Sequence, residues 1–415
     1  MQMLFKTYSF FNSFFNSFLN SEDLVTKLFF LWTVVLIFAS IVLSQTNHTS
    51  SSNDSRFYSE LVEEYHDKNW KEIIAPKWGD NYGERPDSLM RDQFPGQLLL
   101  GVAVSKLGVP PKHALHVVQM FFQVATIFLL FQIATFFIGK TDALVLFYGL
   151  LLIPTAFSYN IRGNHESGIA FFMVLSLLSG IKLNQNSKRW IFIGIFCAVT
   201  LLLIKGPFAI FSPVLFSLGY FFRTSKQCPS SPTERSLYIL TVVLSVFFVI
   251  LTALGYEFLY RLATNESMLE EFYRKQFMER AFELRSTYPF LIQKLVNLYF
   301  YLDCCVTYAL PWIIFVPFIL FIKKFKFKKI AFLNSKLSWL LILASFLLCF
   351  VCSIPNRLAA RYVYPAYYLF AAWSILFAYF NLDFLRRLHQ NILAANALIP
   401  LVVILWLIAF IVHLI

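Results

Sequence analysis

Charged residues are scarce in this sequence. They occupy 14% of its 415 positions, whereas a soluble domain carries about 25%. Hydrophobic residues make up 58%, and phenylalanine alone occurs 49 times. This composition excludes an ordinary soluble domain and indicates an integral membrane protein. The formal net charge of +12 does not indicate nucleic-acid binding, because the lysines and arginines fall in short loops between apolar runs, as they do in membrane proteins.

Cysteine is also scarce, with six residues in the chain. Cys349 and Cys352 form a C-x-x-C pattern, but it lies within the apolar run LLILASFLLCFVCSI. We interpret both as small apolar helix residues rather than as a redox or metal site. No disulfide framework, nucleotide-binding glycine loop or metal-ligand cluster is evident in the sequence. It therefore predicts that no cofactor is required, and it leaves open only a lone divalent-metal site.

The long apolar runs predict an all-α, polytopic integral membrane protein. A span needs about 20 mostly apolar residues. The expected spans are eleven, within a range of 10 to 13: 25–44, 114–137, 142–158, 167–183, 190–204, 206–222, 236–258, 297–321, 337–354, 362–380 and 392–413. The stretch 95–110 is short and bracketed by prolines, so we expect an interfacial or re-entrant helix there; if it spans, the count is twelve. The first run is long for a cleaved signal peptide, which favours a retained signal anchor.

Lysines and arginines in the short loops predict how the chain crosses the membrane. They cluster after the fourth, sixth, eighth and tenth spans. With eleven spans, these loops share one side with the N-terminus, and that side is predicted to be cytoplasmic. The expected organisation is a cytoplasmic N-terminus (1–24), a first span (25–44), an outer loop with surface helices (45–113), spans two to seven (114–258), an outer mobile loop (259–296) and spans eight to eleven (297–415).

Candidate acids gather on the opposite, outer side. The stretch RFYSELVEEYHDKNW has Phe57, Leu61 and Tyr65 at helical spacing, which predicts an amphipathic helix on the membrane surface. Asp54 precedes this helix near the membrane exit, where an N-cap and a general base are both open roles. Glu166, in SYNIRGNHESG, opens the fourth span. It is either a functional acid or a solvated acid favoured by the helix dipole.

Three cations on the same side are candidates for binding an anion. Lys205, in LLLIKGPFAIF, lies in a turn between two apolar runs, where it either snorkels to the interface or holds an anion. Arg357 and Arg361, in SIPNRLAARYVYP, are four residues apart, so a helical segment would place both on one face. Two guanidinium groups on one face suit a phosphate. The alternative is that they anchor the tenth span at the interface.

The order of these features resembles the polyprenyl-phosphate-sugar-dependent glycosyltransferases of the GT-C superfamily. The nearest branch is the family of protein O-mannosyltransferases and lipid A aminoarabinose transferases. The resemblance runs from about residue 25 to 380: one span, an outer loop with an early Asp54, an acid after the third span, the KGP turn, LPW, and RYVYP. There are departures. Asp54 stands alone where the family often has an acidic pair, RDQFPGQLLL replaces a KPPL element, and no soluble domain follows the last span.

The resemblance implies a GT-C-like helical bundle that transfers a sugar from a polyprenyl-phosphate-linked donor to an acceptor on the non-cytoplasmic face, with inversion. Asp54 would act as general base, and Glu166 would orient acceptor or sugar. The candidate site residues are Asp54 and Glu166 as catalytic groups, Lys205, Arg357 and Arg361 as ligands of the donor phosphate, and Arg162, His165 and Tyr58 as substrate-binding groups, with no metal ligand.

The expected partners are the lipid-linked donor, a lipid, glycan or protein acceptor, and membrane lipids, with no nucleic acid. The expected location is the plasma or inner membrane. One rival hypothesis is a transporter or flippase of lipid-linked sugar, which predicts charges buried in mid-span and repeated halves. The sequence shows no clear repeat, and its acids lie at span ends. A second rival, a non-catalytic scaffold of the cell envelope, is favoured by no sequence feature.

Overall fold

The computed structural model describes residues 53–77, 89–91, 94–153, 163–184, 188–223, 231–279, 289–323, 332–355 and 358–414, together with Leu24, Lys27 and Leu31. Helices make up most of this part of the chain. Its only extended pairing is an isolated antiparallel bridge between Lys77 and Leu89. The prediction of an all-α membrane protein is therefore confirmed.

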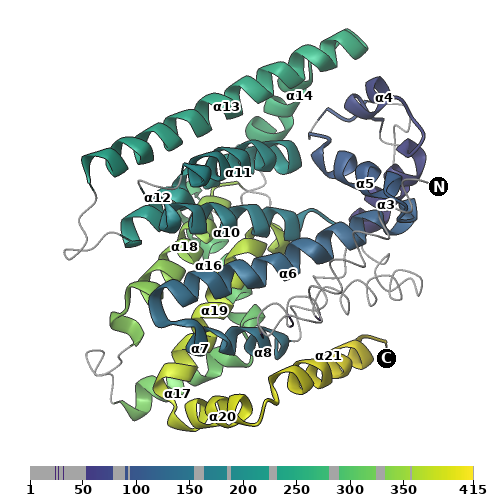
Figure 1. Cartoon of the computed structure of the whole chain (residues 1–415). Coiled ribbons are helices and arrows are strands. Elements are labelled where there is room, and N and C mark those ends of the chain that lie inside the picture. Colours follow the sequence, from purple (N-terminus) through teal and green to yellow (C-terminus); the bar gives the residue numbers. More distant parts are fainter. Residues whose placement is uncertain are drawn as a thin grey trace.

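The helices form a bundle, and the short helices that follow the N-terminus gather at one end of it (Figure 1). The α-helices are α3 (Asn53–Tyr65), α4 (Trp70–Ile74), α5 (Gly96–Lys106), α6 (Pro111–Ile138), α7 (Lys140–Ala143), α8 (Val145–Leu151), α10 (Glu166–Lys182), α11 (Arg189–Lys205), α12 (Phe211–Arg223), α13 (Pro232–Thr264), α14 (Met268–Tyr273), α16 (Phe290–Tyr308), α17 (Phe315–Ile322), α18 (Lys336–Cys352), α19 (Tyr364–Asn381), α20 (Asp383–Ala394) and α21 (Leu398–Leu414). Short 3₁₀ or π segments are η1 (Gly206–Ile210), η2 (Arg274–Glu279), η3 (Trp312–Ile314), η5 (Phe332–Asn334) and η6 (Ala360–Val363).

Fewer helices than expected are long enough to cross a membrane. Within the described residues, four helical stretches are long and apolar enough to cross a membrane: Pro111–Ile138, Arg189–Arg223, Pro232–Thr264 and Ala360–Asn381. Two bent pairs, Phe290–Tyr308 with Trp312–Ile322 (103°) and Asp383–Ala394 with Leu398–Ile408 (111°), raise the count to six if each is one span. The predicted count of eleven is not confirmed. Pro311 lies at the first bend, where it lacks the N–H that a continuing helix needs.

The chain reverses direction at the KGP turn. The Ser212 hydroxyl of α12 lies 3.4 Å from the carbonyl oxygen of Gly194 in α11. In a straight helix these residues would be about 27 Å apart, so α11 and α12 form an antiparallel hairpin. Gly206 stands at the reversal with a φ of 45°, a conformation that glycine adopts readily. Lys205, the last residue of α11, is thereby placed at the tip of the hairpin.

Helices α10 and α12 approach each other closely through small residues. A Cβ on Gly180 would lie 2.0 Å from the carbonyl oxygen of Phe216, and one on Gly219 would lie 2.2 Å from that of Leu177. The Ser176 hydroxyl donates a 2.7 Å hydrogen bond to the Ser212 carbonyl across the same interface. Small residues are the usual means of close helix packing in membranes, and they hold α10, which begins at Glu166, against the hairpin.

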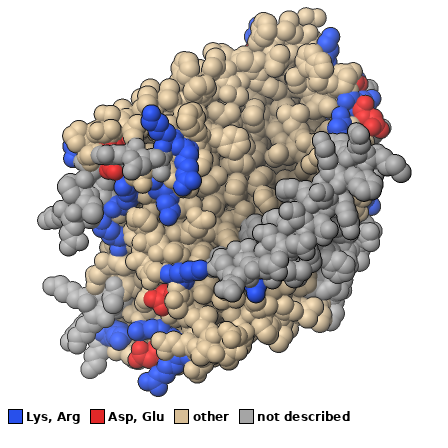
Figure 2. Space-filling view, in the orientation of Figure 1, with Lys and Arg blue, Asp and Glu red and all other residues tan. Residues whose placement is uncertain are grey.

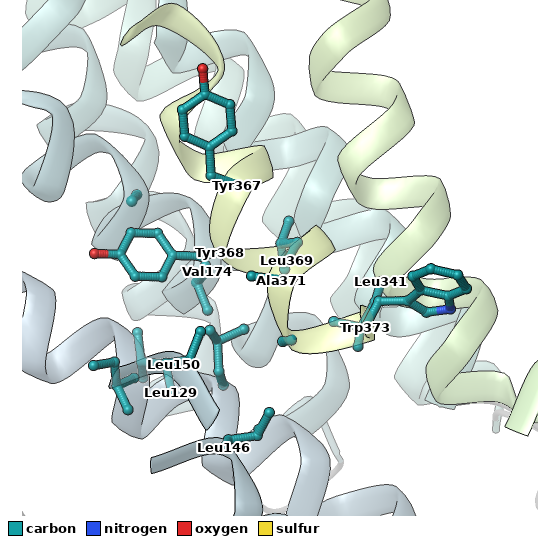
Figure 3. Close-up of a cluster of buried hydrophobic side chains, with 14 of the residues drawn as sticks. Leu129, Leu146, Leu150, Val174, Leu341, Tyr367, Tyr368, Leu369, Ala371 and Trp373 are labelled. Carbon is teal, nitrogen blue, oxygen red and sulfur yellow. The ribbon is translucent and has the colours of Figure 1, made fainter. Parts of the chain in front are cut away.

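Helix α19 lies at the centre of the bundle, and α13 lies at its edge (Figure 1). In the most apolar 18-residue stretch of Ala360–Asn381, 89% of the residues are buried inside the protein. In the corresponding stretch of Pro232–Thr264 only 11% are buried. Side chains of neighbouring helices pack around α19, as Figure 3 shows for Leu129, Leu146, Leu150, Val174 and Leu341 around Tyr367, Tyr368, Leu369, Ala371 and Trp373. The apolar surface of α13 is therefore available to lipid.

Helix α13 continues to Thr264, past the boundary predicted at 258. The carboxylate of Glu257 accepts hydrogen bonds from the Ser267 hydroxyl (2.7 Å) and from the backbone N–H groups of Met268 (3.0 Å) and Leu269 (2.8 Å). It thus caps the first turn of α14. The segment expected to be an outer loop therefore begins with helices.

The antiparallel arrangement of neighbouring helices places basic helix ends together at one end of the bundle. Lys182, Arg189 and Arg223 end or begin α10, α11 and α12 at one end of the bundle. Figure 2 shows lysines and arginines gathered along this end. Glu166, Lys205 and helices α3 to α5 lie at the opposite end (Figure 1). The structure thus places the basic helix ends Lys182, Arg189 and Arg223 opposite Glu166 and Lys205.

Candidate functional site

A hydrogen bond joins the start of helix α3 to the turn before helix α10. The Ser55 hydroxyl accepts it from the backbone N–H of Gly163 at 2.8 Å, and Ser55 is fully buried. A Cβ on Gly163 would lie 3.3 Å from the Ser55 oxygen and 3.2 Å from Nε2 of His116, so little room remains for a larger residue there. The residue after Asp54 is therefore fixed beside the turn that leads to Glu166.

Two buried glutamines extend this connection into helices α5 and α6. The Gln97 amide donates to the carbonyl of Gly163 (3.2 Å) and accepts from the Gln119 amide (3.3 Å). The Gln119 oxygen in turn accepts from the backbone N–H of Gly168 at 2.9 Å. Gln119 thereby satisfies an N–H in the first turn of α10, where no intrahelical acceptor exists. The network fixes both sides of the turn that carries His165 and Glu166.

The apolar face of helix α3, which the sequence predicts to lie on the membrane surface, packs instead against helices α5 and α6. Phe57, Leu61 and Tyr65 are buried against residues of α5 and α6, while Glu63 and Glu64 are exposed. The helix begins at Asn53, so Asp54 lies within its first turn and does not precede it as an N-cap, contrary to one of the two predicted roles. An acid there is favoured by the helix dipole. The side chain of Asp54 lies outside the described residues.

His165 and Glu166 are buried at the mouth of the bundle. Their side chains are 3% and 5% exposed, which overturns the solvated-acid alternative for Glu166. The His165 ring packs edge-on against Tyr58, with 5.7 Å between the ring centroids. Burial lowers the pKa of His165 well below its usual value, and the positive charge of Lys205 lowers it further. His165 is therefore a neutral imidazole, and Lys205 lies close enough to act on it electrostatically.

A cluster of buried tyrosine hydroxyls begins next to Glu166. The hydroxyl of Ser167 is hydrogen-bonded to that of Tyr364, and Glu166 also acts electrostatically on this tyrosine. The Tyr364 and Tyr368 hydroxyls are 2.9 Å apart, and Tyr308 completes the cluster. Sequence reasoning missed these tyrosines. The signal was present, because hydroxyl-bearing rings recur inside the apolar runs YFYLDCCVTY and RYVYPAYY.

Arg361 lies one helical turn before Tyr364, in segment η6. Its side chain is partly exposed, and its guanidinium lies 5.9 Å from the centroid of the Tyr362 ring. Because Tyr364 adjoins Ser167 and Glu166, Arg361 belongs to the same end of the bundle as the buried acid. Arg357 and Arg162, the other predicted arginines, lie outside the described residues.

The gathered groups suit a polar, partly anionic substrate. Asn164, between Gly163 and His165, is 3% exposed, and its Oδ1 has no hydrogen-bond partner within the described chain. An unpaired buried acceptor costs about 1–3 kcal/mol, which a bound hydroxyl or N–H group would recover. Within the described residues, no group of three or more His, Cys, Asp or Glu side chains is placed to hold a metal ion.

No protein-family model and no curated protein matches the chain in sequence. In three dimensions it matches the crystal structure of ArnT from Cupriavidus metallidurans bound to undecaprenyl phosphate, with a TM-score of 0.58, 13% identity and 81% of the chain covered. The chain has the fold of ArnT. It also matches ArnT from the same organism in the apo state, with a TM-score of 0.54, 15% identity and 79% of the chain covered.

The likeness to ArnT confirms the all-helical membrane bundle that the sequence predicts. The matched regions span 59% and 54% of the length of the two ArnT chains. At this identity the likeness shows the fold, and it assigns no role to any residue. The roles of the residues gathered at the site follow from their own geometry and chemistry.

Proposed function

We propose that this protein is a membrane glycosyltransferase that moves a sugar from a polyprenyl-phosphate-linked donor to an acceptor. The observation that carries the proposal is the convergence, at one end of an ArnT-like bundle, of the start of α3 with the buried His165–Glu166 turn and Lys205. ArnT itself binds undecaprenyl phosphate in its crystal structure, which supports a polyprenyl phosphate as the partner.

The position of the site suits a donor that is itself a lipid. Helix α5 has 11 residues, about 16 Å of helix, too short to cross a hydrocarbon core of about 30 Å. It lies with α3 and α4 at the end of the bundle, where a membrane headgroup region would be. A polyprenyl phosphate keeps its chain in the bilayer and presents its sugar phosphate at this level.

In the proposed reaction, the acceptor oxygen attacks the anomeric carbon of the sugar while the bond from that carbon to the phosphate oxygen breaks. Asp54 takes the proton of the acceptor hydroxyl, and the polyprenyl phosphate leaves with the bonding electron pair. Attack from the opposite face inverts the anomeric centre. A positioned base contributes about 10²–10⁴-fold.

Cations stabilise the departing phosphate in this proposal. Lys205 lies at the tip of the α11–α12 hairpin, and Arg361 lies in η6 just before α19. Both are proposed ligands of the phosphate, and Arg357 is the third. Charge accumulates on the phosphate as the bond breaks, so donors placed beforehand stabilise the transition state more than the ground state. No cofactor takes part in the proposed reaction.

The buried polar groups are proposed to hold the sugar or the acceptor. Glu166 accepts hydrogen bonds from hydroxyl groups, and neutral His165 both donates and accepts. The unpaired Asn164 oxygen adds an acceptor beside them, and Tyr58 packs on His165. Arg162 is proposed to contact the substrate from the same turn.

The proposed membrane is the plasma or inner membrane, with the site on its outer face and the N-terminus in the cytoplasm. The basic helix ends Lys182, Arg189 and Arg223 lie opposite the site, the arrangement expected of residues that flank cytoplasmic loops. Single cysteines at positions 64 and 326, in a cysteine-free background, test this, because Glu64 is exposed on α3 at the site end. A membrane-impermeant reagent should label position 64 and not position 326 on intact cells; the reverse would contradict the proposed sidedness.

Incubation of the purified protein with a panel of polyprenyl-phosphate sugars, followed by mass spectrometry of the lipids, tests the activity. A transferase converts one donor to free polyprenyl phosphate and glycosylates an added lipid, glycan or peptide acceptor. A transporter or flippase leaves every donor chemically unchanged, and that result with all acceptors would contradict the proposal.

A further inference from the structure

The segment between helices α18 and η6 is held at its backbone by side chains from other helices. It contains Arg357, and Arg361 follows it in η6. Its described residues are Ser353–Pro355 and Leu358–Ala359. The Asn297 side chain donates hydrogen bonds to the carbonyls of Ser353 (3.1 Å) and Pro355 (3.0 Å). Lys294 donates to the carbonyl of Ile354 between them. Three successive carbonyls are thereby held by helix α16.

Asn297 is itself held in one orientation. It is fully buried, and its side-chain oxygen accepts a 2.8 Å hydrogen bond from the amide of Gln293, one turn earlier on α16. Because the oxygen is engaged by Gln293, the NH₂ group must face the 353–355 carbonyls. The Asn297 side chain therefore links α16 to this segment in one fixed orientation.

Two buried tyrosines hold the backbone immediately before Arg361. The Tyr301 hydroxyl accepts from the N–H of Ala359 at 3.4 Å, and the Tyr367 hydroxyl donates to the carbonyl of Ala360 at 2.6 Å. Tyr301 follows Asn297 by four residues on the buried face of α16. One face of this helix therefore holds the backbone both at 353–355, through Asn297, and at Ala359, through Tyr301.

We propose that Asn297, Tyr301 and Tyr367 are positioning residues that fix Arg361 for binding the phosphate of the lipid-linked donor. The inference rests on the proposed function. The guanidinium is a planar fork that binds phosphate well only when its two N–H groups are aimed correctly. Small misplacements of such groups weaken their action strongly. The contacts on the N–H of Ala359 and on the carbonyl of Ala360 set the direction in which the Arg361 side chain leaves the backbone.

A double-mutant cycle on the full-length protein tests this, with undecaprenyl phosphate as the probe. Its affinity for purified protein is measured for Asn297→Leu, Tyr301→Phe and Tyr367→Phe, each in the native and the Arg361→Ala background. We expect each change to weaken binding by about tenfold when Arg361 is present and by less than about twofold when it is absent. The tyrosine variants lose only a hydroxyl, so they carry the test if Asn297→Leu fails to fold.

Tyr220→Phe is the matched control. Its hydroxyl is buried and has no hydrogen-bond partner within the described chain, and it lies on α12 near the basic end. We expect no change in affinity in either background. Equal weakening with and without Arg361, or no weakening with it, would overturn the positioning role while leaving the proposed function intact. Failure of the unaltered protein to bind undecaprenyl phosphate would overturn both.

Discussion

The hydroxyl of Ser55 accepts a 2.8 Å hydrogen bond from the backbone N–H of Gly163, although 108 residues separate the two in the chain. This contact connects the first turn of α3, which contains Asp54, to the turn that opens α10 at Glu166. The two acids singled out from the sequence thus belong to segments that the fold brings together. The account of the site depends on this contact and on the glutamines that support it.

Removal of the Ser55 hydroxyl should loosen the site. In Ser55→Ala the Gly163 N–H is left buried without this acceptor, which costs about 1–3 kcal/mol, and we expect turnover to fall by about tenfold. Ser374→Ala is the control, because the buried Ser374 hydroxyl donates to a carbonyl of its own helix, α19, away from this contact. Both variants are assayed at equal amounts of folded protein. Equal activity of the two would contradict the proposed importance of the contact.

The close packing of α10 on α12 should tolerate no side chain at Gly180. A Cβ there would lie 2.0 Å from a backbone oxygen, so Gly180→Ala should destabilise the protein by about 3 kcal/mol. Gly255→Ala is the control, since a Cβ on Gly255 meets nothing within 4 Å and alanine favours a helix by about 0.5–1 kcal/mol. In thermal unfolding measured in detergent, Gly180→Ala should lower the midpoint temperature and Gly255→Ala should not.

Acidification should destabilise the protein through His165. Its pKa is lowered well below the usual 6.5 in the folded state, by burial first and Lys205 second. Below pH 6.5 the unfolded chain therefore binds a proton that the folded protein excludes, and stability falls as the pH falls toward the folded pKa. We expect His165→Gln to reduce the drop in unfolding temperature between pH 7 and pH 5. An identical drop in both proteins would show that His165 makes no contribution.

Arg361→Lys separates phosphate binding from anchoring. Lysine keeps the charge and reaches the membrane interface as well as arginine does, but it lacks the planar fork of donors. We expect kcat to fall by about 10²-fold, the scale of losing a donor to developing charge. Arg387→Lys, at the basic end of the bundle, should leave kcat and KM unchanged. Unaltered kinetics in Arg361→Lys would assign the donor phosphate to other cations, Lys205 first.

Local sequence patterns predicted the features that depend on local structure. The helical spacing of Phe57, Leu61 and Tyr65 predicted the buried face of α3. The KGP motif predicted the reversal that puts Lys205 at the tip of a hairpin. The acid at position 166 was expected at the start of a helix, and α10 begins there. In each case neighbouring residues suffice to specify the structure.

Contacts between distant segments were not predictable in this way. Nothing near Gln97 in the sequence indicates that it binds Gly163 and Gln119, because the contact depends on how three helices pack. The tyrosines at 364 and 368 resemble ordinary residues of an apolar span, and only tertiary packing places Tyr364 beside Ser167. The bend after Tyr308 was missed because apolar composition continues through Pro311.

The central claim is that Asp54 drives sugar transfer from a polyprenyl-phosphate donor at this end of the bundle. The most direct measurement is the rate at which purified protein releases polyprenyl phosphate from the donor that it consumes, with Asp54→Asn compared at matched levels of folded protein. The account predicts a loss of about 10²–10⁴-fold in the variant, with donor binding retained. Near-normal release by Asp54→Asn would contradict it.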